Sequence, residues 1–309
     1  MNPILVTGAS GFVGTHLVRS LVRHGFDVVS LFHKSRIEED QRHFRIDLRD
    51  SARLAKLFSQ FSFSAVVHLA AAGVCATNQT LEDVTAVNVA ATASLARLAL
   101  AHRVERFLHV GTGFEYRSQA QPVNESTPLG APNLYGASKA AGWMLLDALH
   151  RLEGLPLVTV RLFSVYGPGE SPSKLVPYSI LQALAGEPIR LSLGSQVRDY
   201  IFVDDAVDAL RLALTTSSAL GKIYNIGAGP AEARSVRRLV EEIVEKIGAP
   251  SRLCWFDRLT RDHCDPPYLV SDPTRAHLEL GWRPQVSFEH GLARTIESFN
   301  TTPVRELSA

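Results

Sequence analysis

Short β-rich runs alternate with amphipathic helical segments from about residue 3 to residue 165. The runs cover residues 4–7, 28–32, 44–46, 65–69, 107–110 and 158–162. Between the first two, Val13, Leu17 and Leu21 recur at helical spacing, and His24-Gly25 is a helix stop signal. Because parallel strands need helical crossovers, this alternation predicts an α/β fold with a doubly wound parallel sheet, covered by helices on both faces.

The pattern becomes irregular after the turn-rich stretch 166–172. We expect helices at 175–185, 204–215, 235–247 and 288–299, and strands at 189–193, 200–203 and 224–226. This half predicts a smaller C-terminal substrate domain made of residues 166–194 and 229–309. The first domain then comprises residues 1–165 plus returning segments at about 195–228. Since no linker or repeat separates the two, they should share a cleft.

Charge and composition exclude several partners. Lys and Arg number 32 against 31 Asp and Glu, without a block of like charge, so we expect no nucleic-acid partner. The apolar stretches are interrupted by polar residues before the roughly 18 positions needed to span a bilayer, so we expect no membrane partner either. Three cysteines without a C-x-x-C pair predict neither a disulfide framework nor a metal site. No signal peptide precedes the first run, which favours a cytoplasmic location.

A glycine-rich segment follows the first run and opens a helix. It reads Thr7-Gly8-Ala9-Ser10-Gly11-Phe12-Val13-Gly14. Glycines at these positions let the chain turn tightly and bring backbone N–H groups to a pyrophosphate at the positive end of the helix. We therefore predict that a dinucleotide contacts Gly8, Ser10, Gly11, Phe12, Val13 and Gly14. The alternative is a glycine-rich turn without a ligand.

The residues after the second run bear on the choice of cofactor. An acidic residue at this point would bind the ribose 2′-hydroxyl of NAD and repel the 2′-phosphate of NADP. This chain has no carboxylate before Glu38 and carries instead His33, Lys34, Ser35 and Arg36. The charge favours NADP, used as NADPH, with NAD as the second choice. A solvated basic loop that binds nothing is the alternative.

Asp47 follows the third run and has two interpretations. With Leu48 beside it, it could accept a hydrogen bond from the adenine amino group. Its carboxylate could equally be the N-cap of the helix that starts at Leu48.

Tyr135 and Lys139 are separated by four positions in a helical segment, which puts them on one face. A nearby ammonium stabilises a phenolate and should lower the tyrosine pKa toward the working pH, making Tyr135 a usable proton donor and acceptor. Thr112 ends the fifth run, at the sheet edge where ligands bind, and its hydroxyl can position a reacting oxygen. The alternative for Thr112 is a plain strand-end turn. We predict Thr112, Tyr135 and Lys139 as catalytic residues.

Further motifs follow in order along the chain. They are His68-Leu69-Ala70-Ala71, Asn88, Arg161-Leu162-Phe163-Ser164-Val165-Tyr166-Gly167-Pro168-Gly169, Arg198-Asp199-Tyr200, and Leu280-Gly281-Trp282-Arg283-Pro284. Together with the glycine loop and the Thr112, Tyr135 and Lys139 set, they resemble the extended short-chain dehydrogenase/reductase family, in its nucleotide-sugar epimerase, dehydratase and reductase branch. The likeness covers nearly the whole chain.

The resemblance implies a Rossmann-type domain and a nucleoside-diphosphate sugar held by the smaller domain. It places Leu69, Ala70, Ala71 and Asn88 beside the cofactor. Matching positions place Phe163, Ser164, Lys174, Val176, Arg198 and Arg261 beside the substrate. Arginine side chains suit diphosphate oxygens, so Arg198 and Arg261 are expected there.

Departures from the family pattern narrow the chemistry. Dehydratases of this branch carry an Asp-Glu pair directly after the active-site Thr, whereas this chain has Gly113-Phe114. Glu115 comes one position late, and alternation should send it to the opposite side. Ser164 replaces the usual Asn. Cys75 could serve as an extra acid or base in the sugar pocket, or be a small buried residue.

These features favour an NADPH-dependent 4-keto reductase acting on a nucleoside-diphosphate 4-keto-6-deoxyhexose, most similar to reductases of the abequose-synthase kind. The alternative is a C4 epimerase that retains NAD, and a third is a non-catalytic NADP-sensing protein. The helical segments 81–100 and 134–152 carry more apolar residues than a single buried helix face needs. This excess predicts a homodimer built on these helices. Burial within one chain would also explain them.

Overall fold

The computed structural model describes residues 2–33, 42–74, 80–260 and 264–301. Predictions made above for Lys34, Ser35, Arg36, Cys75 and Arg261 fall outside the described residues.

A parallel sheet of seven strands forms the centre of the larger part, in the order β10-β6-β5-β4-β1-β2-β3. From β1 the chain winds to one edge, returns to β4, and winds to the other edge. The strands are β1 (Ile4–Thr7), β2 (Val28–Phe32), β3 (His43–Arg45), β4 (Ala65–His68), β5 (Arg106–Thr112), β6 (Leu157–Leu162) and β10 (Ile223–Ile226). The predicted doubly wound sheet is confirmed.

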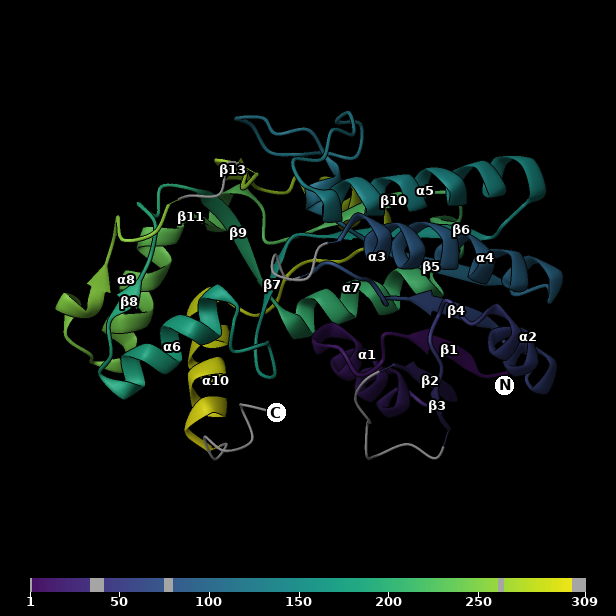
Figure 1. Cartoon of the computed structure of the whole chain (residues 1–309), viewed down its shortest axis with the longest axis horizontal. Helices are drawn as coiled ribbons and strands as arrows, with labels where there is room; N and C mark the ends of the chain where they lie inside the picture. Colours follow the sequence, from purple (N-terminus) through teal and green to yellow (C-terminus); the bar gives the residue numbers. More distant parts are fainter. Residues whose placement is uncertain (1, 34–41, 75–79, 261–263, 302–309) are drawn as a thin grey trace.

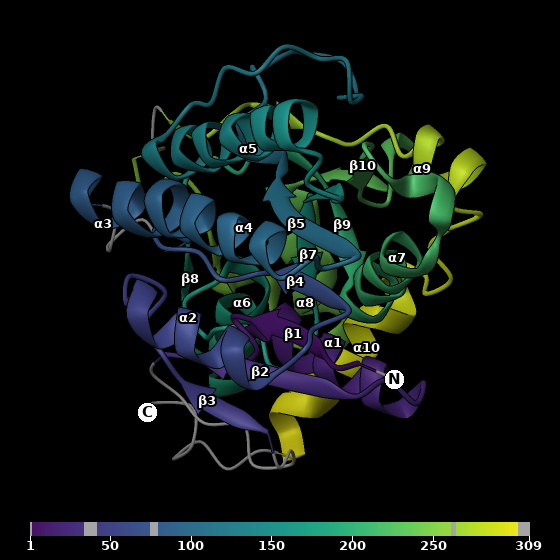
Figure 2. The ribbon, with the colours of Figure 1, turned by 90° about the vertical axis from the view of Figure 1, so that its right-hand side faces the viewer.

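Helices cover both faces of this sheet (Figure 2). One face carries α2 (Ser51–Gln60), α4 (Thr92–Ala101) and α5 (Leu134–Glu153), and the other carries α1 (Phe12–Arg23) and α7 (Val203–Thr215). Alternate strand residues supply the two cores. Leu5, Val66 and Phe107 pack with the first group of helices, whereas Ile4 and Val67 pack with the second. Burial on both faces explains the near-continuous hydrophobic runs in the sequence.

The helix that leads into α4 is irregular. It begins as α3 (Leu81–Thr85) and passes through a π-helical turn, η2 (Ala86–Ala91). By length and composition alone, Leu81–Ala101 could cross a membrane. Its buried residues, including Val84 and Leu95, face the rest of the fold, and this packing accounts for part of the apolar composition. The expected absence of a membrane partner and the cytoplasmic location remain predictions.

The smaller part gathers around a four-stranded sheet of β7 (Ser164–Tyr166), β9 (Val197–Phe202), β11 (Ala233–Ser235) and β13 (Tyr268–Leu269). A two-stranded sheet pairs β8 (Ile189–Arg190) with β12 (Cys254–Trp255). Its helices are α6 (Leu175–Ala185), α8 (Val236–Ile247) and α10 (Phe288–Thr301), which lie together at one end of the molecule (Figure 1). A short helix, α9 (Thr274–Glu279), lies nearer β10.

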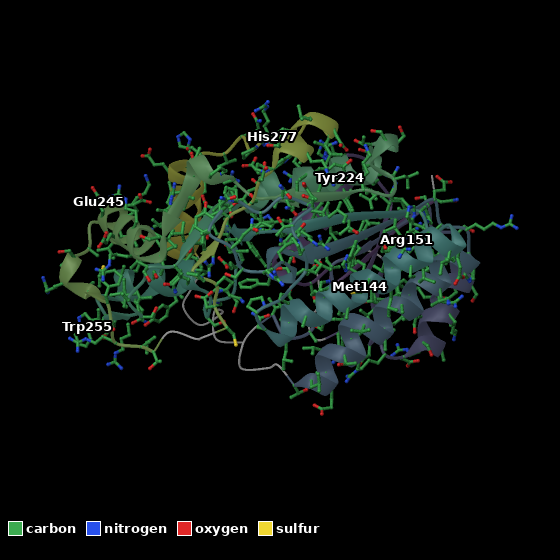
Figure 3. The ribbon with its side chains drawn as sticks, turned by 90° about the horizontal axis from the view of Figure 1, so that it is seen from above. Met144, Arg151, Tyr224, Glu245, Trp255 and His277 are labelled. Atoms are coloured by element: carbon green, nitrogen blue, oxygen red, sulfur yellow. The ribbon has the colours of Figure 1, made fainter. Side chains whose placement is uncertain are left out.

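Residues 195–228 are expected to return to the first domain, but the two strands in this segment belong to different sheets. Strand β10 extends the large sheet, whereas β9 pairs with β7, β11 and β13 of the smaller one. The domain boundaries given above remain predictions. In Figure 3, Trp255 and Glu245 lie at one end of the molecule, whereas Met144 and Arg151, both on α5, lie in its other half.

Candidate active site at the carboxyl edge of the sheet

The glycine loop between β1 and α1 is held by close backbone contacts. Gly8 has φ +69°, and a Cβ there would lie 2.7 Å from the backbone nitrogen of Ala70. A Cβ on Gly14 would lie 2.1 Å from the carbonyl oxygen of Gly8. The loop, the first turn of α1 and the segment after β4 therefore need glycine at both positions.

The N-terminus of α1 fits an anionic group. Gly11 is the N-cap, no side chain caps the helix, and its first turn has no acidic residue. Ser10, Phe12 and Val13 are only partly buried. The first-turn amides and the positive end of the helix dipole are thus available to a pyrophosphate, and the residues present suit the predicted dinucleotide.

We expect Gly14→Ala to abolish dinucleotide binding. The new methyl group can be accommodated only if α1 moves away from Gly8, which opens the loop. The dissociation constant for NADPH, measured by fluorescence titration, should rise at least about tenfold, and thermal stability should fall. Gly25→Ala is the control, because its Cβ meets no atom within 4 Å. That variant should bind NADPH normally despite the strain of its positive φ.

The end of β2 brings His33 close to Asp47, with 3.4 Å between Nε2 and Oδ2. Asp47 also accepts hydrogen bonds from Arg49, which are the main reason why its pKa falls to about 2. The N-cap interpretation of Asp47 is wrong: α2 begins at Ser51, and Asp50 caps it by accepting from the backbone of Arg53. Leu48 is buried in the core below. The adenine contact of Asp47 remains a prediction.

The segment after β4 leads from the sheet edge toward α5. Leu69, Ala70 and Ala71 are partly buried there. Asn88, in the π-helical turn, accepts from the backbone N–H of Ala72 and donates to its carbonyl oxygen and to Ser138 Oγ. Asn88 therefore holds this segment against α5, and its predicted contact with the cofactor is untested.

Helix α5 places Tyr135 and Lys139 above the end of β5. Asn133 caps the helix by accepting from the backbone N–H of Gly136. A Cβ on Gly136 would lie 2.1 Å from the carbonyl oxygen of Phe114, so this glycine lets the first turn of α5 sit directly against the segment after β5. The close approach brings Tyr135 to the same sheet edge as Thr112.

Thr112 ends β5 in a capping box. Its hydroxyl oxygen accepts from the backbone N–H of Phe114, and its own N–H donates to Glu115 Oε1 at 2.8 Å. Among the described residues no acceptor takes the hydroxyl hydrogen, so it can donate to a reacting oxygen.

The proton affinities at the site differ from those expected. Lys139 donates to His109 Nε2 at 3.3 Å, and burial lowers the Lys139 pKa to about 8. Burial, helped by Glu115, raises the pKa of Tyr135 above its ordinary value. The expectation of a lowered Tyr135 pKa is therefore wrong, because desolvation and the negative charge of Glu115 both disfavour the phenolate.

A buried ion pair beneath the site was not anticipated. Arg161 Nε lies 2.7 Å from Glu115 Oε2, and both side chains are at most 1% exposed. The guanidinium also donates to Tyr116 Oη and stacks on the rings of Tyr116 and Trp143. Glu115 thus points beneath the site, as alternation predicts, and is occupied by structural contacts. The sequence signal for this pair was the presence of one charged residue, Glu115 or Arg161, in each of two strand-end segments that are otherwise apolar.

The predicted substrate residues lie across from this edge and have protein partners. Lys174 donates to the carbonyl oxygen of Val74 at 2.8 Å. The Val176 side chain belongs to the core, so only its backbone could meet a ligand. Arg198 pairs with Asp265 and donates to the carbonyl oxygens of Val197 and Pro266. A diphosphate would have to compete with Asp265 for this guanidinium.

Phe163 and Ser164 stand beside the end of β5. Phe163 packs in a small apolar cluster with Tyr116, Val123 and Leu269. Ser164 begins β7 and is partly buried. The substrate roles of both residues, like those of the rest of this set, remain predictions. Within the described part of the chain, no group of three His, Cys, Asp or Glu side chains could hold a metal ion.

Helix α5, which carries Tyr135 and Lys139 one turn apart, packs against the segment that follows Thr112. Together with the uncapped, glycine-lined start of α1 on a doubly wound sheet, this arrangement is that of the extended short-chain dehydrogenase/reductase class of enzymes. Residues 4–227 match the profile of the NAD dependent epimerase/dehydratase family, and the chain belongs to this family. The resemblance stated from the sequence is confirmed.

Named relatives span almost the whole chain. A dTDP-glucose 4,6-dehydratase of Haemophilus influenzae is 31% identical, over 96% of this chain and 97% of its own. A UDP-glucose 4-epimerase of Mycolicibacterium smegmatis is also 31% identical, with the same coverage. Among solved structures, the Thermus thermophilus UDP-glucose 4-epimerase in complex with NAD has a TM-score of 0.88 and 28% identity, covering 97% of this chain and 100% of its own. The relatives are named dehydratases and epimerases, and their substrates are nucleotide sugars.

Proposed function

We propose that this enzyme reduces the C4 keto group of a nucleoside-diphosphate 4-keto-6-deoxyhexose with NADPH. The observation that carries the proposal is the combination of a complete Thr112, Tyr135 and Lys139 set with the loss of the dehydratase acid and base. The sequence at Gly113-Phe114 and Ser164 is most similar to reductases of the abequose-synthase kind.

Packing around Gly113 disfavours the acidic side chain that dehydratases carry at this position. A Cβ on Gly113 would lie 2.9 Å from the ring of Phe163, which is 7% exposed. An aspartate at this position could not enter without displacing that ring. Glu115, the nearest carboxylate along the chain, is buried in its pair with Arg161. The described site therefore has a proton donor for a carbonyl oxygen but lacks the groups that remove water from a sugar.

The residues would act as follows. A bound NADPH would supply the hydride. Tyr135 donates its proton to the nascent alkoxide at C4. Lys139 supplies a positive charge that stabilises the resulting phenolate, and it would contact the nicotinamide ribose. Thr112 orients the carbonyl oxygen through its free hydroxyl hydrogen, and such fixed donors stabilise the charge that develops in the transition state.

NADP is favoured over NAD by the charges after β2. Asp47, the carboxylate that lies beside His33, is engaged by Arg49. Together with Lys34 and Arg36 in the sequence, the Arg49 guanidinium suits a 2′-phosphate.

Purified enzyme should oxidise NADPH only when a keto-sugar is present. We would assay CDP-, GDP-, dTDP- and UDP-linked 4-keto-6-deoxyhexoses with NADPH and with NADH, and determine the product configuration by NMR. Turnover of one of these sugars, faster with NADPH, supports the proposal. Absence of NADPH oxidation with every sugar contradicts it.

A C4 epimerase is the second candidate, because the Mycolicibacterium and Thermus relatives are UDP-glucose 4-epimerases and the Thermus structure is a complex with NAD. An epimerase would retain NAD through purification, and the nucleotide extracted from denatured protein would reveal it. It would also interconvert UDP-glucose and its C4 epimer without added cofactor.

The homodimer also remains a proposal. Helix α5 leaves Met144 and Leu152 exposed at 59% and 80%, and Leu81 of α3 is exposed at 60%. Burial within the monomer therefore does not account for all the apolar residues of these helices.

A further inference from the structure

A row of polar side chains crosses the large sheet beneath the active site. The register places Thr7 beside His68, His68 beside His109, and His109 beside Thr159. All four residues are at most 1% exposed, and they share the sheet face that α4 and α5 cover. Positions of this kind in a parallel sheet are usually apolar, because both faces are buried.

His109 is the member of this row that meets the catalytic helix. Its Nε2 lies 3.3 Å from Lys139 Nζ, and Lys139 is only 2% exposed. A buried ammonium without an acceptor is costly. The imidazole provides an acceptor on the sheet side of Lys139, opposite the surface where a ligand would bind.

The surroundings keep this imidazole neutral. Burial places the pKa of His109 well below its ordinary value, and the charges of Lys139, His68 and Arg161 lower it further. Lys139 is faced by His109 from β5, by His68 from β4 and by Glu115 from the segment after β5, and Tyr135 lies one turn before it on α5. The negative charge of Glu115 raises the pKa of Lys139 and so stabilises its ammonium form, whereas burial lowers that pKa.

His68 and Thr159 do not compete for the same contact. His68 is held by Thr7 Oγ1 and Thr92 Oγ1, each at 2.8 Å. Within the described residues, His109 Nδ1 and the Thr159 hydroxyl have no hydrogen-bond partner. Lys139 is therefore the polar contact that fixes the imidazole, and the imidazole in turn fixes Lys139.

We propose that His109 is a positioning residue that holds Lys139 beneath Tyr135 and keeps it charged by accepting its proton in a hydrogen bond. A neutral imidazole can accept through one nitrogen and donate through the other. The contact at Nε2 therefore survives when Lys139 changes between ammonium and amine, because both forms of Lys139 carry an N–H group that can donate to it. The inference rests on the proposed function in one respect, which is that Lys139 assists Tyr135.

The test is a titration of Lys139 in the ligand-free chain. Protein labelled with ¹³C at lysine Cε would be titrated by NMR, and the Lys139 signal assigned from its loss in Lys139→Arg. In His109→Leu the ammonium loses its acceptor, so the Lys139 pKa should fall by about one unit. In His109→Gln the amide oxygen replaces Nε2, and the pKa should stay close to the original.

Thr159→Val is the matched control, since it removes a buried polar group from the neighbouring strand without touching Lys139. It should leave the Lys139 titration unchanged. Should His109→Leu fail to fold, His109→Asn replaces it, because its shorter amide ends nearer the strand and should give the same fall. An unchanged Lys139 pKa in His109→Leu, or an equal fall in His109→Gln, would overturn the proposal.

A second measurement is the pH profile of keto-sugar reduction. Because reduction consumes the Tyr135 proton and needs a charged Lys139, the alkaline limb of kcat should move to lower pH in His109→Leu and recover in His109→Gln. A purely structural role would lower kcat without moving that limb. The titration needs neither cofactor nor substrate, so its failure would leave the proposed reaction intact. Inactivity toward every keto-sugar would likewise leave the titration result standing.

Discussion

Tyr135→Phe should lower kcat at least about a thousandfold while leaving the affinity for NADPH within about twofold. The substitution removes one hydroxyl and keeps the ring that fills the first turn of α5. Loss of a positioned general acid costs typically a hundredfold to ten-thousandfold. We expect the upper part of that range, because the carboxylate nearest to Thr112 along the chain, Glu115, is sealed in its pair with Arg161. Steady-state kinetics and NADPH titration measure the two effects.

Tyr224→Phe is the control for the loss of a phenol hydroxyl. Tyr224 lies on the edge strand β10, where its hydroxyl donates to Glu279 at 3.1 Å. Its variant should turn over keto-sugar at nearly the original rate. If Tyr135→Phe kept most of its activity, Tyr135 would have no part in the chemistry and the proposed mechanism would fail.

Arg161→Met should destabilise the fold by about 3–5 kcal/mol, the range found when one partner of a buried ion pair is removed. The substitution leaves the carboxylate of Glu115, which is 0% exposed, without its counter-charge. It also removes the group that stacks on Tyr116 and Trp143. For a chain of this size we expect a fall in Tm of roughly 5–8 °C, measured by calorimetry or differential scanning fluorimetry.

Two further variants separate the charge from the packing. Glu115→Gln combined with Arg161→Met removes both charges and should regain a large part of the lost Tm, because no isolated charge remains buried. Arg151→Met breaks an exposed pair with Asp147 on α5, where the arginine side chain is 65% exposed. That control should cost less than about 1 kcal/mol. Equal losses in Arg151→Met and Arg161→Met would contradict the importance assigned to the buried pair.

The parts of the fold that the sequence predicts best are those with short-range causes. The alternation of runs and helices predicts six strands of the large sheet to within two residues at their ends, and the seventh, β10, is expected from the separate run at 224–226. Tyr135 and Lys139 share one helix, so their spacing alone places them together. Gly8 and Gly14 are recognisable because a tight turn between a strand and a helix is a local feature that depends on glycine.

The smaller part is predicted less well. Strands β7, β11 and β13 have two or three residues each, too few for a periodic pattern, and β9 brings them together from distant positions in the chain. The sequence alone allows Asp47 to be either a helix N-cap or an adenine contact. Only the path of the chain after β3 shows that Asp50 caps α2, while Arg49 engages Asp47.

The sequence by itself determined the layered architecture, the glycine loop between β1 and α1 and the placement of Tyr135 and Lys139 on one helix, because hydrophobic period, glycine placement and helical spacing act between neighbours. Only the tertiary structure decided the proton affinities and the polar partners beneath the site. The contact of Lys139 with His109, the pairing of Arg161 with Glu115 and the raised pKa of Tyr135 all follow from burial and from charges that meet across strands. Desolvation depends on what surrounds a group in space, and that is fixed when helix α5 closes over the sheet.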